Sequence, residues 1–555
     1  MKRKHQRDFG WVIDDIINGA TTKTIIVRVT PGGGKSAIPI IAGRLITAGL
    51  ADAIAWVCPR KALQDQGERN FLDPFFRDMF NHKLTIRTAT NDSDPCRGQD
   101  GFITTYQAIC MDQYRSVLRE FSRKRYILVL DEYHHVEEGG IWHRALHSIC
   151  LKAKYLVLMT GTLERGDGKR IAYTPYVETD KGVQPRLTPD NETAVIQYTR
   201  TDALKEGAIL PIKFHLSDGS VQWEEGDGSI EDGTLSTRYE KAGRALFTAL
   251  DTEFGESLLE TGVSHWQRTS TGKLLVVTAN IGHAQMFTAI LKKAGLYAKI
   301  ATSHESAEAL RNIKEFKFCD LNILVTIAMA YEGLDVPAIS HIICLTHIRS
   351  TPWIEQMLAR AVRVWQGAPY TEQIAHIFAP DDTRFRAVVQ RIKAEQLPIV
   401  KPDSGDGTAR EPRDNDGESK EPDFIPIGSE MTGRRELDFG TVPGPPAGFR
   451  PPPPHKTVSE VEAELSAEID GHVNKWSYQN YYKPVRLNGE IKRHFGKGRG
   501  EMGVDELKEV LAYVKQAYPL NGQEPTIMAE TRPRGRGRRV PAKAEPWKPE
   551  QGRLF

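Results

Sequence analysis

The segment TPGGGKS, at residues 30–36, has the composition of a loop that binds nucleotide phosphates. Its glycines let several backbone N–H groups point at phosphate oxygens, Lys35 supplies a charge for the β- and γ-phosphates, and Ser36 supplies a hydroxyl ligand for Mg²⁺. The strict GxxxxGK[ST] pattern is not met, because Arg28 or Val29 stands at the first glycine position. An apolar run before the loop and a helical pattern after it favour this interpretation over a glycine-rich turn with an exposed lysine. The expected nucleotide-binding residues are Thr30, Pro31, Gly32, Gly33, Gly34, Lys35 and Ser36.

A pair of carboxylates, Asp131 and Glu132, stands in YILVLDEYHH (126–135), at the end of another apolar run. At the carboxyl edge of a parallel sheet, the first carboxylate can hold Mg²⁺ and the second can polarise a water for attack on a γ-phosphate. The pair follows the phosphate loop by about 100 residues, as such carboxylates do. We therefore expect a catalytic pair here, and the alternative is an acidic surface turn.

Three polar side chains share one face of a predicted helix in IEQMLARAVRVW (354–365). Gln356, Arg360 and Arg363 stand at positions i, i+4 and i+7, which lie on the same side of an α-helix. Two guanidinium groups presented across a cleft can stabilise the charge of a transferring phosphoryl group. The alternative is a solvated basic stripe.

Seven short runs rich in Val, Ile and Leu indicate strands that are buried on both faces, as in parallel sheets covered by helices. They fall into two groups, which predict two α/β domains at 1–195 and 196–399, with an exposed hairpin or loop at 216–234. The runs are 24–30, 53–58, 126–132, 155–162, 273–280, 322–329 and 341–346.

The C-terminal third has a different composition. Residues 401–423 carry eight acidic and four basic residues, a net charge of −4, and a proline-rich stretch follows. Because such a composition cannot bury a core, we expect 400–455 to be a disordered, proline-rich linker. Helical periodicity then predicts a small α-rich domain at 456–522, and 523–555 reads as a basic disordered tail.

The overall composition excludes few classes. Lys and Arg number 74 and Asp and Glu number 72 in 555 residues, so the formal net charge of +2 neither favours nor excludes a nucleic-acid partner. No apolar stretch reaches about 18 residues, so we expect no membrane association. The six cysteines show no zinc-binding spacing, which is typical of reduced thiols in a cytoplasmic protein.

The motif DEYH (131–134) resembles the DExH box of superfamily 2 helicases and translocases, and the other motifs of that superfamily appear in order along the chain. The matches are 57–66, 102–109, 159–163, 274–287, 326–343 and 354–365. The resemblance implies two tandem RecA-like motor domains that use ATP and Mg²⁺. It is closer to the restriction-translocase and repair-helicase branch than to DEAD-box RNA helicases. The chain departs from the family pattern at Ala359 and Val362, which replace glycines.

The resemblance also assigns roles to single residues. Gln6 stands where the family places an adenine-reading glutamine, and Gly333 and Asp335 match positions near the nucleotide. The residues that the resemblance places against the nucleic-acid backbone are Pro59, Arg60, Thr104, Thr105 and Thr326.

Two features of the C-terminal end suggest partners. Aromatic and basic residues alternate in 476–500, so the aromatics either stack on bases or form a core beneath a basic surface. The last five residues, QGRLF, resemble the pentapeptide that binds the bacterial sliding clamp, through Gln551, Leu554 and Phe555, and the alternative is a frayed terminus.

Together with these patterns, the resemblance implies an ATP-dependent DNA helicase or translocase, a nucleic-acid-stimulated ATPase that serves replication, repair or recombination. We expect it in the cytoplasm of a bacterial cell, or as a phage protein in the cytoplasm of the host. The expected partner is DNA, single-stranded or forked, with RNA as a further candidate. Two alternatives stay open: the motor subunit of a restriction or defence complex, and an RNA helicase.

Overall fold

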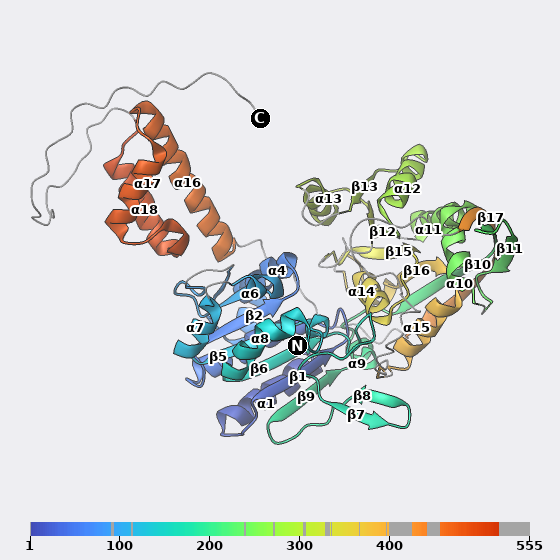
Figure 1. Ribbon diagram of the computed structural model, residues 1–555, viewed down its shortest axis with the longest axis horizontal. Coiled ribbons are helices and arrows are strands. Elements are labelled where there is room, and N and C mark those ends of the chain that lie inside the picture. The colour runs from blue at the N-terminus through green and yellow to red at the C-terminus, as the bar shows by residue number, and fades with distance from the viewer. Residues whose placement is uncertain are drawn as a thin grey trace, which may run out of the picture.

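The computed structural model in Figure 1 shows two α/β domains and a separate helical module. It describes residues 2–89, 94–112, 115–237, 240–269, 272–302, 307–327, 334, 336–365, 367–395, 397–398, 424–440 and 456–520.

The first domain is built on a seven-stranded sheet in which every strand pair is parallel, in the order β3-β4-β2-β5-β6-β1-β9. Its central strands are buried along their whole length, which explains their unbroken apolar sequences. The strands are β1 (Thr24–Val29), β2 (Ala53–Cys58), β3 (Ile86–Thr88), β4 (Gly101–Thr105), β5 (Tyr126–Asp131), β6 (Tyr155–Thr160) and β9 (Thr193–Tyr198). A separate two-stranded ribbon consists of β7 (Tyr176–Thr179) and β8 (Gly182–Pro185).

Eight α-helices and two short 3-10 turns are described in this domain. The α-helices are α1 (Lys4–Ile17), α2 (Ile38–Ala42), α3 (Arg44–Thr47), α4 (Lys61–Leu72), α5 (Pro74–Phe80), α6 (Tyr106–Cys110), α7 (Ser116–Arg123) and α8 (Ile141–Lys152). The 3-10 turns are η1 (Lys35–Ala37), directly after the glycine-rich loop, and η2 (Tyr133–His135), directly after the carboxylate pair.

The second domain has a mixed sheet in the order β11-β10-β16-β15-β12-β14-β13, and β17 pairs with β10. The strands are β10 (Ile212–Glu225), β11 (Ile230–Thr234), β12 (Lys273–Thr278), β13 (Ala298–Ala301), β14 (Ile323–Ile327), β15 (Ile339–Leu345), β16 (Ala375–Pro380) and β17 (Phe424–Phe439). The helices are α9 (Arg200–Lys205), α10 (Ala242–Asp251), α11 (Glu253–Thr269), α12 (Ile281–Lys293), α13 (Ala307–Phe318), α14 (Thr351–Ala361), η3 (Tyr370–Glu372) and α15 (Thr383–Lys393). The two sheets confirm the expected pair of RecA-like parallel-sheet domains, and the hairpin expected at 216–234 is formed by β10 and β11.

Strand β17 corrects the expectation that 400–455 is a disordered linker throughout. It pairs antiparallel with β10 from Glu225, opposite Phe424, to Ile212, opposite Phe439. Both of its terminal phenylalanines are buried, and the Phe439 ring lies 4.5 Å from the guanidinium of Arg200. The acidic composition that predicted disorder belongs to 401–423, whereas 424–439 has enough apolar side chains to complete the sheet. Residues 401–423 and 441–455 lie outside the described part of the chain.

The C-terminal module consists of α16 (Val458–Gln479), α17 (Pro484–Phe495), η4 (Arg499–Glu501) and α18 (Val504–Ala517), as the helical periodicity predicted. It has a hydrophobic core of its own, formed by Ile469, Val473, Leu487, Ile491, Met502, Leu507, Val510 and Val514. Its aromatic side chains divide into a buried and an exposed group, and base stacking by the exposed group stays a prediction. Trp476, Tyr482 and Phe495 pack against this core, whereas Tyr478 and Tyr481 are 83% and 73% exposed.

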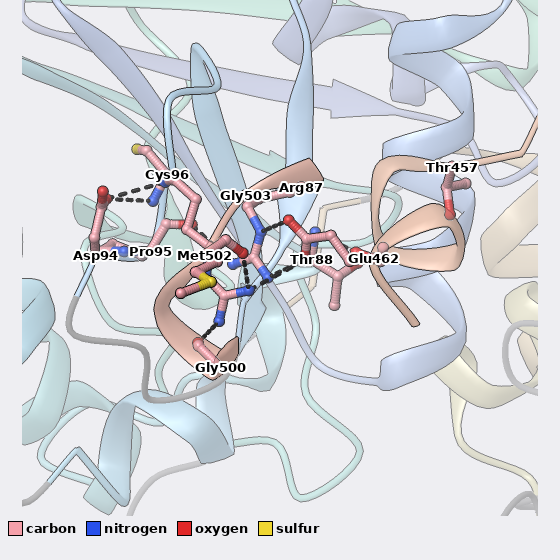
Figure 2. A network of polar contacts seen from close by, with 12 residues as sticks. Arg87, Thr88, Asp94, Pro95, Cys96, Thr457, Glu462, Gly500, Met502 and Gly503 are labelled. Atoms are coloured by element: carbon pink, nitrogen blue, oxygen red, sulfur yellow. Dashed lines mark hydrogen bonds and ion pairs between the residues drawn. The ribbon is translucent and has the colours of Figure 1, made fainter. Parts of the chain in front are cut away.

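A buried ionic network joins this module to the first domain (Figure 2). The carboxylate of Glu462, on α16, accepts hydrogen bonds from Arg87 Nη2 at 2.9 Å and from Arg97 Nη1 at 3.2 Å. Arg87 lies on the edge strand β3, and Arg97 also donates to the carbonyl oxygens of Met502 and Gly500. All three charged side chains are less than 10% exposed.

Within the described ranges, no helix combines the length and apolar character that crossing a bilayer requires.

Candidate nucleotide site between the two sheets

The glycine-rich loop leaves β1 and turns tightly before η1. Gly32 and Gly34 adopt φ values of +84° and +87°, in the region that side chains disfavour. A Cβ on Gly33 would lie 2.7 Å from Val29 Cγ1 and 2.8 Å from the carbonyl oxygen of Thr30. The loop conformation therefore requires glycine at all three positions, as a backbone that wraps around phosphate does.

Lys35 turns from this loop toward the carboxylate pair at the end of β5. Its Nζ lies 3.3 Å from Asp131 Oδ1 and forms an ion pair with Glu132 as well. Although burial disfavours the charged ammonium, the two carboxylates outweigh it and raise the pKa of Lys35. A full positive charge thus stands at the mouth of the phosphate loop.

Glu132 has a strained backbone conformation and an ionised side chain. Its φ of +48° is in the left-handed region, which costs a non-glycine residue about 1 kcal/mol or more. Burial opposes its ionisation, but Lys35 and His134 prevail and hold the pKa of this carboxyl well below its usual value. The carboxylate is therefore ionised at neutral pH, as a general base must be.

His134 connects the carboxylate pair with the TGT segment after β6. Its Nδ1 lies 3.4 Å from Glu132 Oε2 and 2.8 Å from Thr160 Oγ1. The backbone N–H of Gly161 donates to Glu132 at 3.4 Å, and the Thr160 hydroxyl donates to the carbonyl oxygen of Thr162 at 2.6 Å. A movement of Glu132 would therefore be transmitted to residues 160–162.

The second domain contributes the opposite wall of the same pocket, through helix α14 and the residues that follow it. Gln356, Arg360 and Arg363 line one cavity together with the loop residues Thr30–Ser36 and the Asp131–Glu132 pair. Arg360 is oriented by its bond to the carbonyl oxygen of Leu334 at 3.0 Å, and its Nη2 lies 3.4 Å from Gln356 Oε1. The structure thus brings together the three groups that the sequence analysis proposed for one site.

Ala359 and Val362, the two residues that depart from the family pattern, lie where the end of α14 approaches the phosphate loop. Ala359 lines the pocket, and Val362 Cγ2 would be 3.2 Å from a Cβ on Gly32. The carbonyl oxygen of Val362 also accepts a hydrogen bond from the backbone N–H of Leu210 at 2.7 Å. Both side chains therefore pack between the domains without displacing the polar groups.

The donor set of the pocket fits a nucleoside triphosphate with Mg²⁺. The Ser36 hydroxyl and the Asp131 carboxylate are hard oxygen ligands that Mg²⁺ accepts, and they line the pocket beside Lys35. The glycine-rich backbone supplies the N–H donors for phosphate.

Other expected site residues lie elsewhere. Gln6 caps the start of α1, where its Oε1 accepts from the backbone N–H of Arg3 at 3.0 Å. Thr104, Thr105 and Thr326 are buried; Thr105 caps α6, and the Thr326 hydroxyl donates to the carbonyl oxygen of Ala301 at 2.8 Å. Their contact with nucleic acid, and adenine reading by Gln6, stay predictions.

Pro59 and Arg60, expected to contact nucleic acid, line the nucleotide pocket instead. Their contact with a nucleic-acid backbone also stays a prediction. The remaining expected site residues lie outside the described part of the chain: Gly333, Asp335, Gln551, Leu554 and Phe555.

Arg3 is a site residue that the sequence analysis missed. Its Nη1 donates to the carbonyl oxygen of Gly33 at 2.6 Å, and burial lowers the pKa of its guanidinium. Arg3 lies in a basic stretch of the sequence, but no sequence pattern predicts that it contacts a loop 30 residues later. His135, Trp56 and Asn70 also line the pocket and belong to no phosphate-binding pattern.

A second cavity adjoins this site between the domains. It is lined by Glu355 of α14, by Arg28 and Thr30 of the first domain, and by Arg200. Burial raises the pKa of Glu355 to about 7, against the opposing influence of Arg28, Thr162 and Arg200. Because Thr162 influences the pKa of Glu355, the helix that carries the arginines lies near the TGT segment here.

Two family models match the chain in the order of its domains. Residues 3–165 match the model described as "Type III restriction enzyme, res subunit", and residues 256–365 match "Helicase conserved C-terminal domain". The first match includes the phosphate loop and the carboxylate pair. The second ends at the helix and turn that carry the two arginines.

Curated relatives match at low identity. An uncharacterized protein of Mycobacterium tuberculosis is 24% identical over 360 residues, which cover 62% of this chain and 57% of the relative. One from Mycobacterium leprae is 21% identical over 390 residues, covering 68% of this chain and 62% of the relative. The chain therefore spans less than two thirds of either relative.

Among solved structures, the Mycobacterium smegmatis helicase Lhr, bound to single-stranded DNA and a nucleotide analogue, is similar at 15% identity with a TM-score of 0.45. The similarity covers 72% of this chain and 49% of that one. The first domain matches a restriction-enzyme subunit model and the second a helicase model, and the motifs of the two domains meet in one pocket. These matches support the expected placement of the chain among the superfamily 2 helicases and restriction translocases.

Proposed function

We propose that this protein is an ATP-dependent motor that moves along DNA, single-stranded or forked, in replication, repair or recombination. The observation that carries the proposal is the single pocket in which Lys35 and Glu132 of one domain face Arg360 and Arg363 of the other. A site divided between two domains can couple the hydrolysis of a γ-phosphate to a change in how the domains sit against each other.

The residues of the first domain would act as follows. The loop N–H groups and Lys35 bind the phosphates, so Lys35 exchanges its carboxylate partners for phosphate oxygens. Glu132 is then released from that ion pair and can accept a proton from the attacking water. When bound, Mg²⁺ would neutralise phosphate charge, and Ser36 and Asp131 are the residues that would hold it.

The second domain would respond to the γ-phosphate through its arginines. Arg360 and Arg363 stabilise the negative charge that spreads over the transferring phosphoryl group. Loss of that group weakens the attraction between α14 and the loop. Because Glu355 lies near Thr162, this change would reach the segment that already contacts Glu132 through Gly161.

A second candidate function is the motor subunit of a restriction or defence complex. It is favoured by the match of residues 3–165 to a restriction-enzyme subunit and by the helical module that is anchored on the first domain. The exposed Tyr478 and Tyr481 of that module could stack on bases or contact a protein partner.

The experiment that separates these functions measures ATP hydrolysis with single-stranded DNA, duplex DNA and RNA, and strand displacement on 3′-tailed, 5′-tailed and forked substrates. The proposal expects stimulation by DNA well above that by RNA, with displacement or translocation by the chain alone. Stimulation by RNA alone would favour an RNA helicase. Activity that requires a co-purified partner would favour the complex.

A further inference from the structure

Four histidines converge on one face of the second sheet, far along the strands from the nucleotide pocket. His215, His376 and His341 lie on the adjacent strands β10, β16 and β15, and each is within the first four residues of its strand. His265 comes from α11, which packs over this part of the sheet. The arginines of the nucleotide pocket come after the carboxyl-terminal end of β15, whereas His341 lies near the start of that strand. The cluster is therefore separate from the site described above.

The imidazole nitrogens face one another. His215 Nε2 lies 3.0 Å from His376 Nδ1, and His265 Nδ1 lies 3.0 Å from His341 Nε2. One ligand atom each of His215, His265 and His376 lies within 4.8 Å of the other two. Zinc binds imidazole nitrogen at about 2.0–2.1 Å, so tetrahedral ligands are about 3.4 Å apart. Small side-chain rotations would bring the three nitrogens to that spacing.

A carboxylate orients one of these histidines, as carboxylates commonly do for histidine ligands in protein metal sites. Glu436, on β17, places Oε1 3.3 Å from His215 Nδ1, while its Oε2 pairs with Lys213 at 2.6 Å. A proton held on Nδ1 leaves the Nε2 lone pair directed at the cluster, and carboxylate–histidine pairs of this kind fix ligands in metal sites.

We propose that His215, His265 and His376 bind a divalent transition metal of the zinc class, with Glu436 as the positioning residue for His215. His341 lies beneath the site and is fixed by contacts of its ring nitrogens with Ser340 and His265. The ligands come from strands β10 and β16 and from helix α11, so the ion would tie that helix to the sheet. The nucleotide pocket contributes none of these ligands, so the ion would take no part in ATP hydrolysis.

The alternative is a cluster of neutral imidazoles joined by N–H···N hydrogen bonds, since each neutral ring has one donor and one acceptor. The two arrangements differ in metal content and in the consequence of losing one ring. His265 is the best residue to change, because it is on the helix and its removal leaves the strand pairing intact. His147, exposed on α8 of the first domain, is the matched control.

The test uses the full chain without an affinity tag, stripped with a chelator and then dialysed against Zn²⁺ or Co²⁺. We expect about one equivalent of zinc by mass spectrometry, visible cobalt d–d bands without a thiolate band, and a rise in Tm on adding zinc. His265→Ala should bind zinc about 100-fold more weakly and lose the rise in Tm, and Glu436→Gln should weaken binding by about 10-fold or more. His147→Ala should behave as the wild type.

If His265→Ala does not fold, His376→Gln is measured in the same way. Zinc content well below one equivalent in the repleted wild type, or equal content and equal Tm shift in the wild type and the ligand variants, would overturn the proposal and leave the hydrogen-bonded cluster.

Discussion

The ammonium of Lys35 lies 3.3 Å from the carboxylate of Asp131, so the phosphate loop and the end of β5 are joined by a charge pair where the two meet. Glu132 shares this ammonium. The carboxylates of its own domain and the phosphates of a nucleotide would therefore compete for Lys35. Under the proposed function, its exchange from one to the other would link nucleotide binding to the release of Glu132 as the base.

Replacing Glu132 tests the role of that base. Glu132→Gln keeps the size of the side chain and removes the proton acceptor, so kcat for ATP should fall by about 100-fold or more while nucleotide affinity is retained. Phosphate release and fluorescent-nucleotide binding measure the two quantities. Glu138→Gln, at an exposed carboxylate nearby, is the control. A Glu132→Gln enzyme with wild-type kcat would exclude this residue as the base.

Arg363 should act on the transition state more than on binding. Arg363→Ala removes one guanidinium from the wall of the pocket, and we expect kcat to fall by about 1000-fold with KM changed much less. Steady-state kinetics at saturating DNA measure this split. Arg384→Ala, at an exposed position of α15, provides the comparison. If KM rose by a similar factor while kcat stayed unchanged, Arg363 would contribute to nucleotide binding alone.

The sequence predicted the parts of the site that lie in local patterns. The glycine loop, the carboxylates after an apolar strand and the helical spacing of Gln356, Arg360 and Arg363 are each recognisable within about a dozen residues, and all three groups line the same pocket. Arg3 could not be found in this way, because its contact with Gly33 depends on how α1 packs against the loop.

The sequence analysis failed where long-range pairing decides the outcome. Strand β17 forms because β10 offers it an edge, although the residues before it have a composition typical of disorder. The histidine cluster was missed for the same reason. His215, His265 and His376 are 50 and 111 residues apart in the chain, and only the strand order brings them together.

Glu355 should make stability depend on pH. The folded-state pKa of Glu355, about 7, lies above the ordinary glutamate pKa of 4.5, so the folded protein retains a proton that the unfolded chain releases. This stabilisation is complete below pH 4.5 and is lost as pH rises through about 7. The effect of Glu355→Gln on the free energy of unfolding should therefore be more stabilising at pH 8 than at pH 5, by about 2–3 kcal/mol.

Thermal unfolding of Glu355→Gln and the wild type at pH 5 and pH 8 measures this difference. Glu372→Gln, at an exposed residue, should show no such change. The same Tm difference at both pH values would show that Glu355 does not titrate in this range.

Glu462 should hold the helical module on the first domain. Glu462→Gln removes the charge that Arg87 and Arg97 share, and breaking a buried ion pair costs about 3–5 kcal/mol. We expect faster hydrogen exchange in β3 and in the first turns of α16, while α18 keeps its protection. Glu468→Gln, which breaks an exposed pair with Lys515 within the module, is the control. Unchanged exchange in β3 would mean that other contacts carry the docking.

The central claim is that this chain hydrolyses ATP at the Lys35 site in response to DNA. The most direct measurement is the rate of ATP hydrolysis with and without single-stranded DNA for the wild type, for Lys35→Ala and for Lys152→Ala at an exposed position of α8, each with its Tm to verify folding. We predict DNA-stimulated hydrolysis in the wild type and in Lys152→Ala, and a loss of about 100-fold or more in folded Lys35→Ala. Full DNA-stimulated hydrolysis by Lys35→Ala would contradict it.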